Sequence, residues 1–315
     1  MFDMREKMAE IDSLPLVTAV IPTYRRPELI LAALKSALDQ TYKNIEVLVI
    51  VDGPYPPTEE ILATVQDERV RVIVNQVNVG LAEVKNIAAQ HARGEYIALL
   101  DDDDEWFPTK IEKQLAVALE LGGDNVMVFS QFLDKTNELT RVQPYAFPKG
   151  PQKFSEYLFC ERGNLQSSTW FISTALMRKV PFGKGLRIED LDWLLRATAD
   201  ETVKIGKVEE PLSVYTNLDT GARITSTGNW EILLIWGLTN RKYFTRRAFS
   251  YFMVTLCIGR ARQSKVSLRT YLFLISTAVL LGSARPGTFM YLFGYLLFSN
   301  SRRRAIKDFL KRRRS

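Results

Sequence analysis

Histidine and cysteine, which supply many metal sites and catalytic nucleophiles, are almost missing from this chain of 315 residues. The one histidine is His91, and the two cysteines, Cys160 and Cys257, lie far apart with no other typical ligand beside them. Neither a disulfide framework nor a zinc site is therefore indicated. A mechanism that depends on a catalytic histidine has little to use, and a structural role is the favoured interpretation of His91.

Long apolar segments are missing as well. Met1 to Leu14 is charged and has no apolar core of the kind that a secretory signal contains, so we expect the N-terminal part to stay in the cytoplasm. Two apolar runs near the C-terminus, Tyr271–Gly282 and Thr288–Phe298, each cover about 18 Å as helices, whereas the hydrocarbon core of a membrane is roughly 30 Å thick. A single transmembrane span is therefore not expected.

Acidic residues are nearly absent from the last quarter of the chain. Residues 241–315 hold 17 Lys and Arg and one acid, whereas residues 1–240 hold 25 basic and 35 acidic residues. Apolar helices beside a basic cluster are typical of a monotopic anchor on an anionic membrane surface. Helices that pack on the rest of the protein, or that form an oligomer contact, are the alternative. No nucleic-acid-binding element is recognisable, so no nucleic-acid partner is expected.

The first 130 residues alternate apolar runs with amphipathic stretches. This pattern predicts an α/β fold with a Rossmann-like, mostly parallel sheet and helices on both faces. The predicted strands are Leu16–Ile21, Ile45–Val51, Val70–Val74, Tyr96–Leu100 and Val126–Phe129. The predicted helices begin near Pro27 and include Glu59–Val65, Leu81–Ala92, Phe107–Leu121 and, further on, Glu189–Ala199. Lys135 to Gly163 is irregular, and the chain beyond Trp230 is helical.

Four consecutive carboxylates, Asp101 to Asp104, follow the predicted strand Tyr96–Leu100. Like charges this close raise one another's pKa, and a divalent cation removes that cost. Oxygen ligands suit Mg²⁺ and Mn²⁺, which often bind substrate phosphates at the same time. Ligands of parallel sheets lie at the carboxyl ends of the strands, so the sequence predicts a metal–diphosphate site here. A solvated acidic turn is the alternative.

Five sequence blocks then occur in order between Leu16 and about Phe107. They are VIPTYRR from Val20, VIVDG from Val49, NVG from Asn78, KN from Lys85 and GEYIALLDDDD from Gly94. This ordered set resembles the family 2 glycosyltransferases of the GT-A fold, whose blocks read PTYNR, VDDGS, NxG, RN and GEYIxxLDxDD. A lone acidic cluster is weak evidence, whereas the ordered set is specific.

The resemblance implies a nucleotide-sugar site. Its implied contacts are Pro22, Thr23, Tyr24, Arg26, Asp52, Gly80, Lys85, Asp101 and Asp102. Within this set Tyr24 offers an aromatic face to the nucleobase, Asp52 accepts a hydrogen bond from the base edge, and Arg26 and Lys85 meet phosphates. Gly53 departs from the family pattern, which often has a second Asp there, so uracil is favoured but base selectivity stays open.

The resemblance also implies the metal ligands. Asp101 and Asp103 match the two aspartates of the D-x-D motif, with Asp102 in the variable position. Asp103 is the expected direct ligand of Mn²⁺ or Mg²⁺, and Asp101 is expected to bind the ribose or the metal.

A catalytic base is implied further along the chain. The segment Arg187–Arg196 looks like the family's EDxDxxLR block, in which the Asp of the Glu-Asp pair is the base, here Asp190. An inverting transfer needs a carboxylate that takes the proton of the acceptor hydroxyl. An acidic first turn of a helix, favoured by the helix dipole, is the alternative interpretation. A histidine that often follows in the family is Leu218 in this chain.

These observations together predict an inverting, metal-dependent glycosyltransferase. It would move one sugar from a nucleotide-sugar, a UDP-sugar being favoured, to a lipid-linked saccharide acceptor in polysaccharide or glycan assembly. The expected domains are a catalytic domain of residues 1–230, with a donor half (14–134) and an acceptor half (135–230), and a membrane-associating tail (231–315). The expected location is the cytoplasmic face of the membrane, and a homo-oligomer is left open.

Two alternatives belong to other classes of function. One is a membrane-tethered protein that binds nucleotide-sugars without turning them over. The other is a nucleotidyltransferase, which has less support because no Gly-rich phosphate loop follows the first predicted strand.

Overall fold

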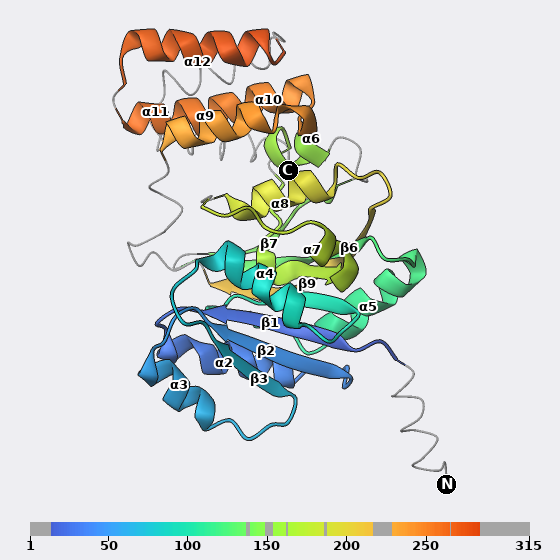
Figure 1. The fold of residues 1–315 in the computed structure, drawn as a ribbon. Coiled ribbons are helices and arrows are strands. Elements are labelled where there is room, and N and C mark those ends of the chain that lie inside the picture. The colour runs from blue at the N-terminus through green and yellow to red at the C-terminus, as the bar shows by residue number, and fades with distance from the viewer. Residues whose placement is uncertain are drawn as a thin grey trace. The chain divides into compact units, whose positions relative to one another are not determined.

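The computed structural model describes residues 14–136, 139–148, 154–161, 163–185, 188–216, 229–264 and 266–283 (Figure 1). The chain divides into two compact units. The first consists of residues 1–152 and 164–222, and the second of residues 153–163 and 223–315. The predicted apolar run Thr288–Phe298 and the basic residues after it lie outside the described residues.

The described strands of the first unit form one nine-stranded sheet in the order β3-β2-β1-β4-β8-β6-β9-β5, with β7 paired to β6. Their bounds are β1 (Val17–Thr23), β2 (Ile45–Val51), β3 (Val70–Val74), β4 (Tyr96–Leu99), β5 (Asp104–Trp106), β6 (Val126–Lys135), β7 (Thr140–Gln143), β8 (Trp170–Ser173) and β9 (Lys204–Thr216). Strands β1 to β4 pair in parallel, as predicted. Beyond them, β8 is antiparallel to β4 and β6, while β9 is parallel to β6 and antiparallel to β5.

Helices cover both faces of this sheet, which confirms the predicted α/β class (Figure 1). Those of the first unit are α2 (Pro27–Leu38), α3 (Pro56–Ala63), α4 (Leu81–His91), α5 (Lys110–Leu121), α7 (Thr174–Lys179) and α8 (Glu189–Ala197). All seven residues of β2 are buried, as expected for a β-branched strand in the middle of a covered parallel sheet. Side chains of α2 and α5 form the core on one face, and α4 packs on the other.

The order of the strands along the chain reverses at β1. From β1 the chain moves through β2 to β3 on one side, whereas β4 lies against the opposite side of β1. Ligands of open α/β sheets bind where the strand order reverses in this way. The ends of β1 and β4, and the residues that follow them, therefore border the expected ligand site.

The second unit is built from helices. They are α6 (Phe154–Phe159), α9 (Trp230–Thr239), α10 (Arg246–Phe252), α11 (Gly259–Gln263) and α12 (Leu268–Leu280), with one π-helical stretch (Met253–Ile258) between α10 and α11. Five aromatic rings form its core, with neighbouring centroids 5.2–6.1 Å apart: Phe159, Trp236, Phe244, Phe249 and Phe252. Among the described residues, no helix is long and apolar enough to cross a membrane.

Candidate active site

Three carboxylates meet at the carboxyl end of β4. Asp101, Asp103 and Asp104 each place one carboxylate oxygen within 4.8 Å of the others. Asp101 follows β4, and Asp104 begins the short strand β5, which pairs with β9. Asp104 is not among the sequence-predicted ligands, yet it is almost fully buried beside the two that are. We call these three residues the acidic triad.

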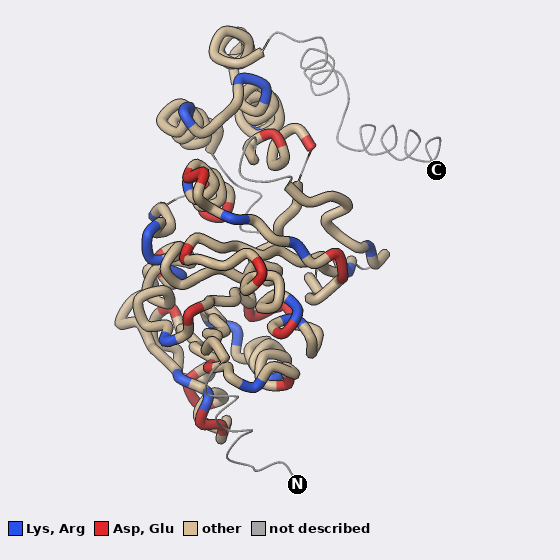
Figure 2. The backbone as a smooth tube through the Cα atoms, turned by 90° about the vertical axis from the view of Figure 1, so that its right-hand side faces the viewer, with Lys and Arg blue, Asp and Glu red and all other residues tan. Residues whose placement is uncertain are grey.

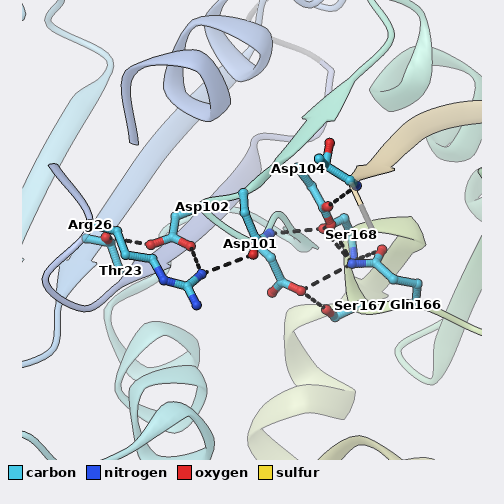
Figure 3. Close-up of polar contacts among 10 residues, drawn as sticks. Thr23, Arg26, Asp101, Asp102, Asp104, Gln166, Ser167 and Ser168 are labelled. Carbon is cyan, nitrogen blue, oxygen red and sulfur yellow. Dashed lines mark hydrogen bonds and ion pairs between the residues drawn. The ribbon is translucent and has the colours of Figure 1, made fainter. Parts of the chain in front are cut away.

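A turn from the second half of the first unit holds two members of the triad, Asp101 and Asp104, in place (Figure 3). The hydroxyl of Ser167 donates to Asp101 Oδ2 and that of Ser168 donates to Asp104 Oδ2, each at 2.6 Å. Gln166 Nε2 contacts both carboxylates, at 3.2 Å from Asp101 Oδ2 and 2.5 Å from Asp104 Oδ2. Local sequence patterns do not reveal these three residues, because their contacts with the aspartates are purely long-range.

The electrostatics of the triad suit a cation. Burial raises the pKa of Asp101 despite the nearby Lys85, and burial together with the charge of Asp101 raises the pKa of Asp104. The cluster therefore carries more negative charge than its surroundings balance. Clustered carboxylate oxygens are the ligands that Mg²⁺ and Mn²⁺ prefer, so the residues present fit a divalent metal ion.

Asp102, in the middle of the motif, points to β1 instead. Thr23 Oγ1 donates to Asp102 Oδ2 at 2.7 Å, and Arg26 Nη1 lies 3.0 Å from Asp102 Oδ1 and 3.0 Å from Asp103 Oδ2 (Figure 3). Asp102 thus links residues 101–104 to the end of β1 by a hydrogen bond. Arg26, which the sequence predicts to meet phosphates, lies next to Asp103 and therefore at the border of the triad.

Asp52 organises the loop that follows β3. Its carboxylate accepts hydrogen bonds from the backbone N–H groups of Val79 and Gly80, at 2.8 and 2.9 Å, and from Asn75 Nδ2 at 3.2 Å. Gly53 beside it has φ +101°, and a Cβ there would lie 3.0 Å from the backbone N of Asn78. Glycine at this position therefore lets the end of β2 touch the loop. The predicted contact of Asp52 with a nucleobase stays a prediction.

Lys85 and Asp190 form the most buried ion pair of the site. The Lys85 side chain on α4 is fully buried, and its Nζ lies 2.7 Å from Asp190 Oδ1 in the first turn of α8. Burial by itself lowers the pKa of Lys85, but Asp190 and Asp101 outweigh it and raise the pKa. Lys85 therefore stays charged, and it lies close to both the predicted base and the triad. Its predicted contact with phosphate stays a prediction.

The remaining predicted contacts lie at the end of β1. Pro22 is buried in the strand, and the ring of Tyr24 is partly exposed. The guanidinium carbon of Arg25 lies 5.3 Å from the centroid of the Tyr24 ring and 5.7 Å from that of Tyr55. The aromatic face that the sequence predicts at Tyr24 is present, and Tyr55, in the loop after β2, lies near the same guanidinium.

A separate hollow of about 510 Å³ lies on the sheet near β6 and β9. Its lining comprises Gln131, Tyr145, Ala146, Phe147, Pro148, Ile205, Gly206, Lys207 and Glu209. Lys207 is in register with Phe129, so both side chains project from the same face of the sheet. Phe129 contacts Trp170, which stacks on Trp193 of α8. The hollow therefore lies on the face of the sheet that carries α8 and Asp190.

Comparison with known proteins agrees with this geometry. The model of glycosyl transferase family 2 matches residues 18–179, which is about half of the chain and includes the acidic triad. The chain belongs to glycosyl transferase family 2. It is therefore a glycosyltransferase, and the alternatives from other classes lose their support.

Three similar proteins illustrate the relationship. A putative colanic acid biosynthesis glycosyl transferase of Escherichia coli, WcaA, is 28% identical over 83% of this glycosyltransferase and 94% of the relative. The E. coli glucosyltransferase WfaP is 41% identical over 32% of this chain and 40% of its own. The crystal structure of Staphylococcus aureus TarS residues 1–349 has a TM-score of 0.60 at 17% identity, covering 84% of this chain and 81% of that one. At that identity the TarS likeness supports the GT-A fold.

Proposed function

We propose that this glycosyltransferase moves one sugar, with inversion of the anomeric centre, from a nucleotide-sugar to a hydroxyl group of a saccharide acceptor, with the help of a divalent metal ion. The observation that carries the proposal is the position of Lys85. Its buried ammonium binds Asp190 and also lies close enough to Asp101 for both charges to raise its pKa. A proton acceptor and a metal-binding triad therefore share one lysine.

The chemistry assigns a separate task to each group. The acceptor oxygen attacks the anomeric carbon while the bond from that carbon to the diphosphate oxygen breaks, and the hydroxyl proton passes to Asp190. Lys85 holds the Asp190 carboxylate in position through its 2.7 Å contact. Asp101, Asp103 and Asp104 would hold Mn²⁺ or Mg²⁺, which would supply positive charge for the departing nucleoside diphosphate. Arg26 lies beside Asp103 and stabilises the same negative charge.

The names of relatives support the choice of donor and acceptor. TarS has been crystallised with UDP-GlcNAc, and WfaP is named as a transferase from UDP-Glc to a diphosphoundecaprenol-linked sugar. WcaA is named for colanic acid biosynthesis. We therefore favour a UDP-sugar as donor and a lipid-linked saccharide as acceptor, in the assembly of a polysaccharide.

A donor panel tests this proposal. Binding and hydrolysis are measured with UDP-, GDP- and dTDP-sugars in the presence of Mn²⁺, Mg²⁺ or EDTA. We expect one UDP-sugar to bind and to be hydrolysed when metal is present, and we expect neither binding nor hydrolysis in EDTA. Equal binding in EDTA would overturn the role of the metal, and no response to any nucleotide-sugar would overturn the function.

The hollow near β9 supports a saccharide acceptor. It combines aromatic side chains, Tyr145 and Phe147, with the polar side chains of Gln131, Lys207 and Glu209. Apolar faces with a few polar groups are typical of small-molecule sites. In Tyr145→Ala we expect a several-fold higher KM for the acceptor and an unchanged rate of donor hydrolysis. An unchanged acceptor KM would exclude the hollow as part of the acceptor site.

We further propose that the second unit binds the cytoplasmic face of an anionic membrane, peripherally or as a monotopic anchor. Apolar side chains of α12 are largely exposed, with Leu268 at 74%, Leu272 at 58% and Phe273 at 53%. Along α9 to α12 the described residues include one acid, Glu231, and seven bases: Arg241, Lys242, Arg246, Arg247, Arg260, Arg262 and Arg269 (Figure 2). Exposed apolar and basic side chains together favour an anionic lipid surface.

Vesicle sedimentation tests the membrane proposal. We expect the protein to bind phosphatidylglycerol-containing vesicles, and to bind phosphatidylcholine vesicles much less. Leu272→Glu should release it, because a charge cannot enter the apolar layer. Leu119→Glu, at a leucine of α5 in the first unit that is 49% exposed, is the matched control and should still bind. Equal binding of both variants would overturn the proposal.

A further inference from the structure

Arg25, the second residue after β1, has a strained backbone. Its φ is +54°, and among the described residues all others with a positive φ are glycines. Residues with a Cβ adopt this left-handed region rarely, and asparagine tolerates it best. Such strain persists where the rest of the structure enforces it, and it is concentrated at functional sites. The turn alone does not explain an arginine at position 25, because a glycine or an asparagine would adopt the same backbone conformation with less strain.

The side chain of Arg25 has aromatic neighbours and no acidic partner. Its guanidinium lies over the rings of Tyr24 and Tyr55, at 5.3 and 5.7 Å, and it makes no hydrogen bond or ion pair with any residue that the structure describes. The adjacent Arg26 differs, because it pairs with Asp102 and Asp103. The exposed guanidinium of Arg25 thus keeps its N–H donors for a ligand.

The position of Arg25 points to the nucleoside part of the donor. Strands β2 and β4 flank β1 on opposite sides. The acidic triad follows β4, whereas Tyr55 follows β2. With the diphosphate at the triad, the nucleoside extends across the end of β1 toward β2. Arg25 and Tyr55 lie along that path.

We propose that Arg25 selects the nucleobase of the donor by donating hydrogen bonds to a carbonyl oxygen on the base edge. A guanidinium has donors and no acceptor, so it favours the carbonyl oxygens O4 of uracil and O6 of guanine over the amino groups N4 of cytosine and N6 of adenine at the same positions. A site built to bond one group rejects the analogue that lacks it. This inference rests on the proposed nucleotide-sugar function and adds the base selectivity that the sequence leaves open.

Two matched nucleotide pairs test the inference. All four nucleotides share ribose and diphosphate. UDP has a carbonyl where CDP has an amino group, and GDP has a carbonyl where ADP has an amino group. Calorimetry with Mn²⁺ is expected to show wild type favouring UDP over CDP, and GDP over ADP, on the order of tenfold. In Arg25→Asn both ratios should fall to near one. The same variant should melt about 2 °C higher, because asparagine relieves the backbone strain.

Control variants separate selectivity from charge. Arg25→Lys keeps the charge and still has donors without an acceptor, so it should retain part of the discrimination although it loses the planar donor geometry of the guanidinium. Arg93→Asn removes an exposed arginine just before β4, at the opposite end of the strands, and should leave both ratios unchanged. Unchanged affinity ratios in Arg25→Asn would overturn the inference. Equal loss of affinity for all four nucleotides would overturn it as well, because Arg25 would then bind the diphosphate that they share. If wild type binds none of the four, the proposed function itself fails.

Discussion

The ammonium of Lys85 lies 2.7 Å from the carboxylate of Asp190, and the lysine side chain is fully buried while that of the aspartate is 36% exposed. The exposed part of Asp190 is thus open to an acceptor, while its other side is fixed. A carboxylate held in this way is suited to accept a proton from a substrate hydroxyl.

Asp190→Asn removes the proton-accepting group with little change of shape. We expect the transfer rate to fall about 10²- to 10⁴-fold, the usual contribution of a general base, while nucleotide binding persists. Steady-state kinetics with a donor and acceptor, together with calorimetry for the nucleotide, measure the two effects separately.

Asp192→Asn is the control for that variant. Asp192 lies on the same helix but pairs with Arg196 at 2.6 Å instead of Lys85. Its loss should reduce the melting temperature and leave the rate per folded molecule unchanged. A fast Asp190→Asn enzyme would exclude Asp190 as the base.

Ser168→Ala should lower the metal affinity of the triad although it leaves all three proposed ligands in place. Its hydroxyl donates to Asp104 and accepts from the backbone N–H of Asp101. Loss of such a supporting contact typically lowers metal affinity by roughly 10- to 100-fold. Mn²⁺ titration followed by electron paramagnetic resonance measures it. Ser213→Ala, at a buried serine whose hydroxyl lacks a hydrogen-bond partner among the described residues, should leave the affinity unchanged.

Metal binding should weaken as the pH falls. Burial and the charges of neighbouring aspartates raise the pKa of Asp101 and of Asp104, so in the metal-free protein these groups take up protons at a higher pH than ordinary carboxylates. A cation must displace those protons. Mn²⁺ titrations at several pH values between 5 and 8 are expected to show rising affinity with rising pH and proton release on binding. A pH-independent affinity would contradict the uncompensated charge described for the triad.

A second buried lysine gives a stability prediction away from the site. Lys110 is fully buried above the Trp106 ring, at 4.4 Å, and burial lowers its pKa well below the ordinary value. The unfolded chain therefore binds a proton that the folded protein does not, and stability rises with pH up to the ordinary pKa near 10.4. Between pH 7 and 9.5, wild type should gain free energy of unfolding relative to Lys110→Met. Denaturant titrations of both proteins measure this, and parallel pH profiles would refute it.

Much of the donor half is predictable from local patterns. The strands β1, β2 and β4 are mainly apolar and fully buried, and the candidate site residues Thr23, Asp52 and Asp101 are found by looking where each of them ends. Such strands are recognisable because a strand that is buried on both faces is apolar along almost its whole length.

The second half of the site follows no such pattern. Local patterns do not predict strand β9, because it is half exposed and contains Pro211. A proline usually argues against a strand, but Pro211 lies at an irregularity in the pairing of β9 with β6. Strand β5 was missed because it begins inside a run of acids, and the only hint was the alternation of buried Asp104, exposed Glu105 and buried Trp106. Gln166 to Ser168 meet the aspartates through contacts more than sixty residues apart, which no local periodicity reveals.

The pairing of β5 with β9 has a consequence for the order in which the protein matures. Asp104 is in register with Tyr215, so the strand that carries one triad member finds its partner only when the chain has been synthesised beyond that residue. Contacts between distant residues form late, because closing a long loop costs entropy before the contact returns any stability. The ends of β1 and β2, where we propose that the nucleotide binds, are thus synthesised well before the acidic triad can be completed, and a chain truncated before Tyr215 is expected to lack the pairing that positions Asp104.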